Sequence, residues 1–439
     1  MVHDVCLILE GTYPYRTGGV GHWVAGLLHH LSSLDFALVH LGVGDAPTGS
    51  WAYTPPVNLH ELVYVPLNRF DHPEQVEEAL PQRLTLPRAR LYHALSTGFA
   101  GLLGLQLKQQ TGRPFLLTEH GIYWREIEAG AGELECGFQV IRDGAGQPAL
   151  QARRPHWAIA FQELARRIYA EADWVTTVSE SGRRLQLRLG APPQRTQVIP
   201  NGVDLNRFGG PARRLPPQGP YHVGLVGRVV PLKDVVTFIR AAYHVTIHRD
   251  DVYFWVVGPT NHTPDYAARC QELVQRLGLS DRLTLVGEMD PAGWYRQFHL
   301  LTLTSRSESL PLALLEGMAG GLPVVATHVG DLPALVYGRW EAGDRLGTAG
   351  VLAPPGDHQA IARAILRLLD DKRLYRHASR TARERIRRFY RQEPVWAAYQ
   401  ALYQRFLADP RSPEVRDRIH PRRVLLGNSL SLLTSAFLR

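Results

Sequence analysis

Two basic residues stand near the end of one expected strand, in the sequence GRVVPLKD. Arg228 follows the apolar run 222–227, and Lys233 comes five residues later, just before a helical pattern begins. A strand end that leads into a helix start directs both cations, and the free N–H groups of the helix, toward one edge of the sheet. Two cations there suit a diphosphate. A basic pair beside a helix is also commonly solvated, so this segment needs support from others.

Two glutamates follow in the sequence SESLPLALLEGMAGGLPVVAT. Glu308 stands in the turn after an expected strand, and Glu316 lies in the helix that follows. Glu316 could accept both hydroxyls of a ribose, and Glu308 could accept hydroxyls of a sugar. A proline fits the first helical position, and the N–H groups of the first turn can receive phosphate oxygens. These N–H groups are expected near Pro311 and Leu312, and Leu310, Pro311 and Leu312 are the expected substrate-binding residues of this segment. The alternative is that Glu316 is a helix-surface carboxylate and Glu308 a cap.

Glycines mark further strand ends. Gly258 ends a strand in VVGP, Gly287 and Glu288 end another in VGE, and Gly18 and Gly19 precede a helix that begins near residue 21. Glycine permits close approach of the backbone to a flat ring or a phosphate. Each of these positions, taken singly, is at least as well explained by a tight turn.

Histidines occupy two different environments in the first half. His120, in TEHG, ends the expected strand 115–118, whereas His93, in LYHAL, lies inside a strand and is expected to be a hydrogen-bonded core residue. A zinc site made of His93, His120 and Cys136 lacks any ligand spacing.

These residues require a framework of parallel strands. Short β-branched runs alternate with segments of helical period almost from end to end, which indicates a parallel sheet with helices on both faces. Strands in the first half are expected at 5–10, 36–43, 59–65, 91–95, 115–118, 174–178 and 197–199. The second series is expected at 222–227, 252–257, 283–287, 300–305, 323–327 and 350–353.

The order of the segments predicts two doubly wound, Rossmann-like α/β domains that face each other across a cleft. The predicted parts are an N-terminal acceptor-side domain, a Gly/Pro/Arg-rich linker, a C-terminal nucleotide-sugar-binding domain, a helix that crosses back, and a tail. Their bounds are 1–208, 209–220, 221–390, 391–410 and 411–439.

Composition limits the class of protein. The chain of 439 residues is 45% hydrophobic, carries a formal charge of +8 and has three widely spaced cysteines. No signal peptide or membrane-spanning stretch is recognised, so a cytoplasmic location is expected, with the inner face of the membrane as a further option. The charge suits phosphate-bearing ligands, and no nucleic-acid-binding pattern accompanies it. The arginines of helix 378–391 are taken as a solvated face in preference to a site for an anionic partner.

Several motifs together resemble glycosyltransferase family 4 of the GT-B fold. GR-x4-K followed by E-x7-E has the pattern of that family. The N-terminal half resembles the glycosyltransferase of Pel exopolysaccharide synthesis in DVCLILEGTYPYRTGGVGHWV, FALVHLG, LYHALSTGFAGLLG, LTEHGIYWRE and VIPNGVD. The resemblance covers roughly residues 4–400. It implies a retaining enzyme that uses a UDP-hexose, with the Gly19 amide facing the donor phosphate or the acceptor and His120 contacting the donor sugar.

The implied chemistry needs no metal or cofactor. The chain contains no Asp-x-Asp motif, so Arg228 and Lys233 are expected to replace a metal ion at the diphosphate. Departure and attack on the same face of the sugar is favoured over a covalent intermediate, because no strand-end carboxylate presents itself for nucleophilic attack. Expected partners are a nucleotide sugar, a glycan acceptor and a membrane-bound synthesis complex. Two alternatives stay open: a UDP-sugar 2-epimerase and a non-catalytic UDP-sugar-binding subunit.

Three features depart from the family pattern. Ser309 stands where the family often has glycine, and serine resists positive φ, so the loop there could be reshaped. Trp124 replaces a smaller polar residue, and residues 129–155 are expected to form an acceptor-side or flexible loop. The tail carries apolar residues at helical spacing and is expected to dock on the protein or a partner. These residues are Leu426, Leu430, Leu433 and Phe437.

Overall fold

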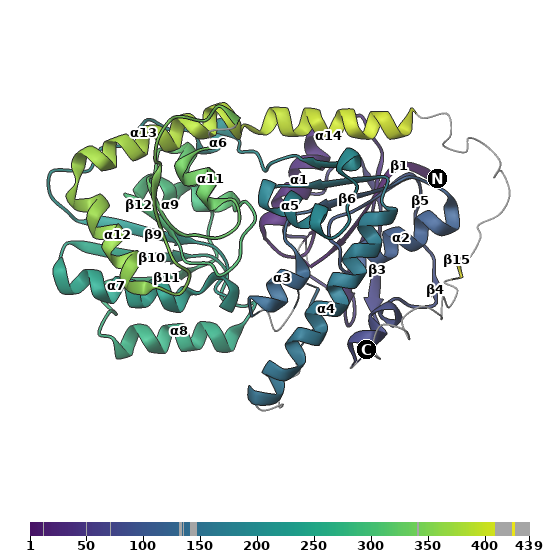
Figure 1. The fold of residues 1–439 in the computed structure, drawn as a ribbon, viewed down its shortest axis with the longest axis horizontal. Coiled ribbons are helices and arrows are strands. Elements are labelled where there is room, and N and C mark those ends of the chain that lie inside the picture. The colour runs from purple at the N-terminus through teal and green to yellow at the C-terminus, as the bar shows by residue number, and fades with distance from the viewer. Residues whose placement is uncertain are drawn as a thin grey trace. The chain divides into compact units, whose positions relative to one another are not determined.

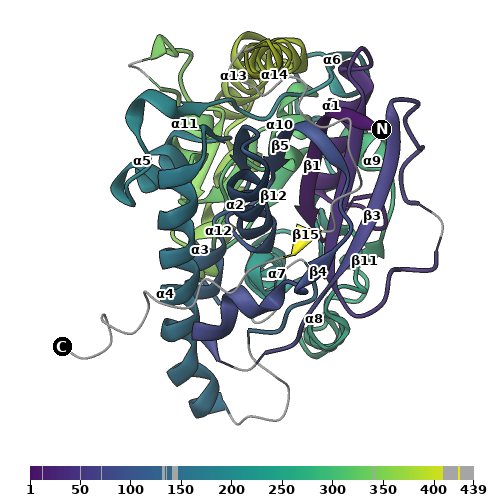
Figure 2. The same cartoon turned by 90° about the vertical axis from the view of Figure 1, so that its right-hand side faces the viewer.

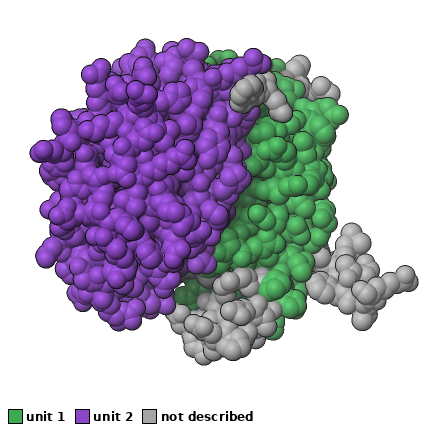
Figure 3. All heavy atoms as spheres, turned by 60° about the vertical axis from the view of Figure 1, so that its left-hand side comes forward, with its two compact units in different colours: residues 1–199, 396–439 green, residues 200–395 purple. Residues whose placement is uncertain are grey.

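The computed structural model describes residues 1–11, 13–49, 51–70, 72–130, 134, 136–140, 147–339, 342–408 and 424–425; of residues 147–154 and 424–425 it describes the backbone alone. The chain divides into two compact units. Unit 1 comprises Met1–Ile199 and Trp396–Arg439, and unit 2 comprises Pro200–Val395. Figure 3 shows unit 1 in green and unit 2 in purple.

Unit 1 is built on a seven-stranded parallel sheet of order β3-β2-β1-β5-β6-β7-β8 (Figure 1). Its central strands are apolar along their whole length because helices cover both faces of a parallel sheet. Val5 of β1 lies beside Phe36 of β2 on one side and Leu91 of β5 on the other. The strands are β1 (Val2–Glu10), β2 (Phe36–Val43), β3 (Leu59–Leu67), β5 (Arg88–Ala94), β6 (Phe115–Glu119), β7 (Trp174–Thr177) and β8 (Thr196–Val198).

Six helices accompany this sheet. They are α1 (Gly19–His30), α2 (Phe99–Thr111), α3 (Tyr123–Glu128), α4 (Gln147–Glu171), α5 (Glu180–Arg188) and α14 (Gln392–Leu407). Most of α14 belongs to unit 1, where its Tyr399 and Tyr403 are fully buried. A short antiparallel pair joins β15 (Val424–Leu425) to β4 (Arg83–Leu84).

Unit 2 repeats the architecture with a six-stranded parallel sheet of order β11-β10-β9-β12-β13-β14, whose strands β9 to β12 are labelled in Figure 1. Figure 2 turns the view so that strands β1 and β3 and helices α2 and α4 of unit 1 come forward. The strands are β9 (Tyr221–Val226), β10 (Val252–Val257), β11 (Leu283–Gly287), β12 (Leu300–Leu303), β13 (Val324–Thr327) and β14 (Gly350–Ala353). The helices are α6 (Leu205–Phe208), α7 (Val235–His248), α8 (Pro264–Arg276), α9 (Pro291–Gln297), α10 (Leu312–Ala319), α11 (Leu332–Tyr337), α12 (His358–Asp370) and α13 (Lys372–Phe389).

The core of unit 2 includes a fully buried arginine. Arg385 of α13 pairs with Asp344, its Nε lying 2.5 Å from Oδ2. Its remaining N–H groups donate to the carbonyls of Leu335, Val336 and Gly347 at 2.7 to 3.0 Å. The guanidinium therefore fixes α13 to the segments that follow β13.

The predicted fold class is confirmed: the chain has two Rossmann-like parallel sheets with helices. One expectation was wrong, since α4 already begins at Gln147 within the segment taken as a loop. The expected position of Pro311 was off by one residue. Pro311 is the N-cap of α10, with φ −73° and ψ 125°, and the helix begins at Leu312 rather than at the proline. The predicted role of the tail falls outside the described residues, apart from the backbone of 424–425.

Candidate functional site

The carboxyl edge of the unit 2 sheet brings three strand-end glycines together. Gly227, Gly258 and Gly287 follow or end the adjacent strands β9, β10 and β11, and the Gly258 N–H donates to the Gly287 carbonyl at 2.8 Å. A Cβ on Gly258 would lie 2.1 Å from the Gly227 carbonyl oxygen, and Gly258 has φ +153°. The backbone there leaves no room for a side chain. Gly287, with φ +87°, faces open space, and Glu288 beside it is exposed.

Lys233 ends a short 3₁₀ helix, Pro231–Lys233, that precedes α7. Its ammonium group forms an ion pair with Glu308 Oε1, and both side chains are largely buried. Ser305 Oγ donates to the same Glu308 oxygen at 2.6 Å. Two residues far apart in the sequence, Lys233 and Glu308, are therefore brought into contact as one cluster with Ser305.

Backbone contacts hold this cluster in place. Thr304 Oγ1 donates to the carbonyls of Lys233 and Asp234, each at 3.0 Å, and the Arg306 N–H donates to the Leu232 carbonyl at 2.9 Å. The end of β12 is thus fixed to the 3₁₀ helix. Arg228 begins the same β9 loop as a half-buried residue.

Backbone atoms around Gly330 pack closely against the loop that carries Glu308. A Cβ on Gly330 would lie 1.9 Å from the Glu308 carbonyl oxygen, and the Asp331 N–H donates to the Ser309 carbonyl at 3.1 Å. Among the described residues other than glycine, only Asp234 has positive φ. Ser309 therefore keeps an ordinary backbone, and the strain expected of a serine at this position does not arise.

The start of α10 is held by a contact from Asn201, which lies before α6. Asn201 Nδ2 donates to the Leu310 carbonyl at 2.8 Å, and the Pro311 carbonyl accepts the N–H of Leu314 at 3.2 Å. The N–H groups of Leu312 and Ala313 precede the first helical hydrogen bond, so the helix itself provides no acceptor for them. They are available to an anion.

Glu316 lies one turn further along α10 as a half-buried carboxylate. Tyr295 of α9 donates its hydroxyl to Glu316 Oε2 at 2.9 Å. Burial raises the pKa of Glu316 to about 7, an effect that the Tyr295 hydrogen bond and the charge of Arg207 oppose and that Asp290 reinforces. Near neutral pH this carboxyl group therefore exists in both protonation states.

In unit 1, two glycines stand at the start of α1. The Gly18 N–H donates to the Tyr53 hydroxyl at 3.1 Å, and the Gly18 carbonyl accepts the His22 N–H at 2.9 Å. Gly19 is exposed, and a Cβ there would meet no atom within 4 Å. The space over Gly19 is open to a ligand.

His120 directly follows β6, and its ring packs edge-on against Trp23 of α1 with 4.6 Å between centroids. Burial lowers the pKa of His120 to about 3, so the ring is neutral at physiological pH. Its Nε2 is buried and makes no hydrogen bond to any described residue. A neutral ring with an unsatisfied nitrogen fits contact with a polar ligand better than proton donation.

His93 is a core residue, as its sequence context predicts. It is 1% exposed, and its ring nitrogens bond to the hydroxyls of Tyr403 and Thr118, each at 2.7 Å.

Sequence reasoning missed two buried carboxylates at the strand ends of unit 1. Glu10 ends β1 and accepts Ser96 Oγ and the Ala100 N–H, each at 2.6 Å, and the Tyr123 hydroxyl at 2.5 Å. The signal was available, because an acidic residue that ends an apolar run must be buried or lie at an edge. Glu10 satisfies the N-terminus of α2 rather than a ligand.

Glu119 ends β6 in the same way. It accepts the hydroxyls of Thr97 and Tyr169, each at 2.5 Å, and the Gln186 amide at 2.8 Å. Burial raises its pKa. Together with Glu10 it fixes the loop between β5 and α2, and its oxygens are engaged with these three donors.

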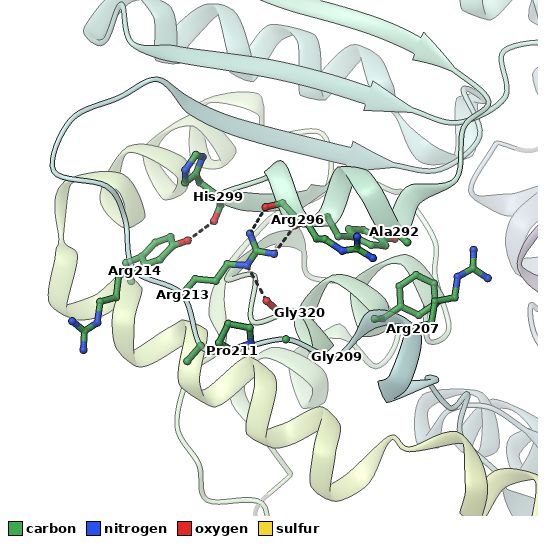
Figure 4. A pocket seen from close by; sticks show the side chains of 14 residues that line it. Arg207, Gly209, Pro211, Arg213, Arg214, Ala292, Arg296, His299 and Gly320 are labelled. Atoms are coloured by element: carbon green, nitrogen blue, oxygen red, sulfur yellow. Dashed lines mark hydrogen bonds between the residues drawn. The ribbon is translucent and has the colours of Figure 1, made fainter.

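A cavity of about 420 Å³ opens at the opposite edge of the unit 2 sheet, next to residues 209–214. Arg213 reaches into it but donates to the carbonyls of Tyr295, Phe298 and Gly320 at 2.7 to 2.8 Å, at the C-terminal ends of α9 and α10 (Figure 4). Figure 4 shows Arg207 and Arg214 pointing away from each other. The cations do not converge, so the cavity is not the expected diphosphate site.

Among the described residues, no group of three or more His, Cys, Asp or Glu side chains is arranged to hold a metal ion.

Two family models match the chain. The one described as "Domain of unknown function (DUF3492)" covers residues 3–85 and 79–194, and the one described as "Glycosyl transferases group 1" covers residues 220–371. The first match lies within unit 1 and the second within unit 2.

Curated relatives include two bacterial proteins named D-inositol 3-phosphate glycosyltransferase. The one from Segniliparus rotundus is 27% identical over 407 residues, which cover 82% of this chain and 84% of the relative. The one from Thermobispora bispora is 32% identical over 316 residues, covering 65% and 69%.

Solved structures share the fold over most of the chain. Sucrose-phosphate synthase from Thermosynechococcus elongatus has a TM-score of 0.68 at 21% identity and covers 92% of this chain and 99% of its own. Anabaena Alr3699/HepE in complex with UDP and glucose has a TM-score of 0.66 at 17% identity and covers 92% and 100%.

Proposed function

This chain belongs to the glycosyl transferases of group 1, enzymes that transfer a sugar from a nucleotide sugar, and from that membership we propose that it moves a hexose from a UDP-linked donor to a growing glycan with retention of configuration. The observation that carries the proposal is the Lys233–Glu308–Ser305 cluster, which joins the two parts of the motif GR-x4-K and E-x7-E. Support for UDP comes from the structural relative solved in complex with UDP and glucose, Anabaena Alr3699/HepE.

Each residue of the unit 2 edge has a role in this proposal. Arg228, Lys233 and the first N–H groups of α10, after Leu310 and Pro311, hold the diphosphate. Glu316 accepts the ribose hydroxyls, and Glu308 accepts hydroxyls of the sugar. The base lies against the glycine-lined strand ends. The residues concerned there are Gly258, Gly287 and Glu288.

Two residues of unit 1 complete the assignment. The open backbone at Gly19, next to Gly18, is proposed to contact the donor phosphate or the acceptor. His120 is proposed to contact the donor sugar. The unsatisfied Nε2 of His120 supports this role, since a buried polar atom without a partner costs stability unless a ligand supplies one.

The proposed reaction proceeds on one face of the sugar. The bond from the anomeric carbon to the diphosphate oxygen breaks, the acceptor oxygen bonds to that carbon from the same side, and the departing phosphate takes the acceptor's proton. Positive groups aimed at the leaving diphosphate stabilise the charge that develops on it. The engagement of Glu10 and Glu119 in structural hydrogen bonds supports this route over a covalent glycosyl-enzyme.

We expect a panel of UDP, ADP and GDP sugars to separate the candidates, with UDP-glucose giving the largest rise in melting temperature. Nuclear magnetic resonance of the product should show the donor's anomeric configuration retained, and activity should survive EDTA because the two cations take the place of a metal. An inverted product, or activity abolished by EDTA and restored by Mg²⁺, contradicts the mechanism. Donor turnover without any acceptor would favour the 2-epimerase. Tight UDP binding without any donor hydrolysis would favour a non-catalytic binding subunit.

The biological setting is proposed to be exopolysaccharide synthesis of the Pel type at the inner face of the membrane, on the strength of the N-terminal motifs. In the described part of the chain no helix is long and apolar enough to cross a bilayer. The helix α13 carries one lysine, seven arginines and one glutamate. Four of its arginines are exposed and spaced along one stripe, with no carboxylate of the described residues in an ion pair with them: Arg373, Arg376, Arg380 and Arg387.

Flotation with lipid vesicles tests this setting. We expect binding to phosphatidylglycerol vesicles at low salt and loss of binding at 1 M NaCl, because charges at a membrane surface are screened by salt. Replacing Arg376, Arg380 and Arg387 by glutamine should weaken binding by at least about tenfold. Equal binding to neutral phosphatidylcholine vesicles would rule out the electrostatic attachment. A matched control replaces the exposed arginines of other helices, namely Arg184, Arg188 and Arg240.

A further inference from the structure

We propose that Tyr295 is a positioning residue for nucleotide binding: its hydroxyl donates to the carboxylate of Glu316 and orients it, so that Glu316 can accept the hydroxyls of the donor's ribose. The inference rests on the proposed function, because it requires Glu316 to be the ribose-binding residue. It concerns a residue of α9 that no motif of the sequence singles out.

The contact is well defined. Tyr295 is 3% exposed, and its hydroxyl donates to Glu316 Oε2 at 2.9 Å. Its ring packs edge-on against Phe208 with 6.0 Å between centroids, and its carbonyl accepts Arg213 Nη2 at 2.7 Å. The backbone and the ring of Tyr295 are therefore each held by a neighbouring residue.

The contact leaves Glu316 free to bind. The Tyr295 hydroxyl is the one hydrogen-bond donor to the carboxylate of Glu316 among the described residues. A carboxylate has about four lone-pair sites on its two oxygens, so one donor leaves room for both hydroxyls of a ribose. Tyr295 fixes the direction of the carboxylate without filling it.

The charges around Glu316 explain why a donor is needed. Burial raises the pKa of Glu316 to about 7; the Tyr295 hydrogen bond and Arg207 of α6 lower it, and Asp290, the cap of α9, raises it. Arg207 also forms an exposed ion pair with Asp290 at 2.8 Å, and this pairing reduces the effect of Arg207 on the pKa of Glu316. Loss of the tyrosine hydroxyl should therefore raise the pKa of Glu316 further.

Calorimetric titration with UDP at pH 6 to 9 tests the proposal. For the wild type, affinity should rise about tenfold from pH 6 to pH 8, because the fraction of ionised Glu316 rises from about one tenth to about nine tenths. Tyr295→Phe should bind UDP about fivefold more weakly at pH 7, because loss of the hydroxyl raises the pKa of Glu316, and the deficit should shrink to about twofold or less at pH 9, where Glu316 is ionised in both proteins.

Tyr375→Phe is the matched control. Tyr375 is also fully buried in unit 2, borders the same cavity as Tyr295 and donates its hydroxyl to the His299 carbonyl at 2.8 Å, without contact to Glu316. We expect this variant to lose comparable stability and to keep the wild-type pH profile of UDP binding. A Tyr295→Phe profile that matches the wild type, or a deficit that is the same at every pH, overturns the proposal.

Glu316→Gln separates the two levels of the inference. The glutamine variant should bind UDP weakly and without the pH dependence. If it binds as the wild type does, the ribose assignment of Glu316 fails, and the proposed site with it. If it is defective while Tyr295→Phe is not, the assignment stands and only the role of Tyr295 is overturned.

Discussion

Replacing Lys233 by methionine is expected to lower the rate of UDP release from UDP-glucose by a factor of about 10² to 10³, the usual effect of removing one group that stabilises the leaving charge. Lys233 is held by Glu308, and its ammonium group has three N–H donors, so it can keep that ion pair and still donate to a phosphate oxygen. Methionine retains the length of the side chain and removes the charge. The rate is measured at saturating donor, so that weaker binding does not account for the loss.

Lys108→Met provides the matched control. Lys108 of α2 is also partly buried and ion-paired, with 2.8 Å to Asp173, but belongs to unit 1 and has no role in the proposed site. The Lys108→Met enzyme should lose some stability and keep its rate of UDP release within about twofold of the wild type. A Lys233→Met enzyme that is as active as the Lys108→Met enzyme would contradict the electrostatic role. Glu308→Gln removes the partner and tests whether the ion pair is needed to direct the lysine.

The sequence predicted the strands because their signal is local. Each buried parallel strand is a short β-branched run bounded by turn residues, and this pattern locates β1 and β9 to within a few residues. The start of α4 was missed for the opposite reason. Its first turns contain glutamine, proline and arginine, and such a composition predicts a loop unless tertiary contacts stabilise the helix.

In the candidate site, too, the sequence predicted what has a local signal and missed what depends on contacts between distant residues. Lys233 and Glu308 were selected by their spacing in a motif, but their ion pair joins residues 75 positions apart, and the sequence contains no signal for such a distant pair. Tyr295 was missed because it resembles any other buried aromatic residue of a short helix. Glu10 and Glu119 were missed because the search was for free carboxylates, whereas both are engaged in hydrogen bonds with residues of other elements.

Arg385→Met is expected to destabilise unit 2 by about 3 to 5 kcal/mol, because it leaves the buried Asp344 carboxylate without its cation. The carbonyls of Leu335 and Val336 also lose their donor, since both accept from Arg385 Nη1. For a unit of this size the loss corresponds to a fall of roughly 10 °C in the melting temperature of the unit 2 transition. Differential scanning calorimetry measures it, with the unit 1 transition as an internal reference.

Arg388→Met, three residues along the same helix, is the control. Arg388 pairs with Glu384 at 2.5 Å, but its side chain is 57% exposed, and exposed pairs on a helix contribute about 0.5 kcal/mol or less. The double variant Arg385→Met, Asp344→Leu should recover much of the loss, because it removes the unpaired charge together with its partner. An Arg385→Met protein as stable as Arg388→Met would mean that water reaches Asp344, and burial of this arginine would then contribute nothing to the packing of α13.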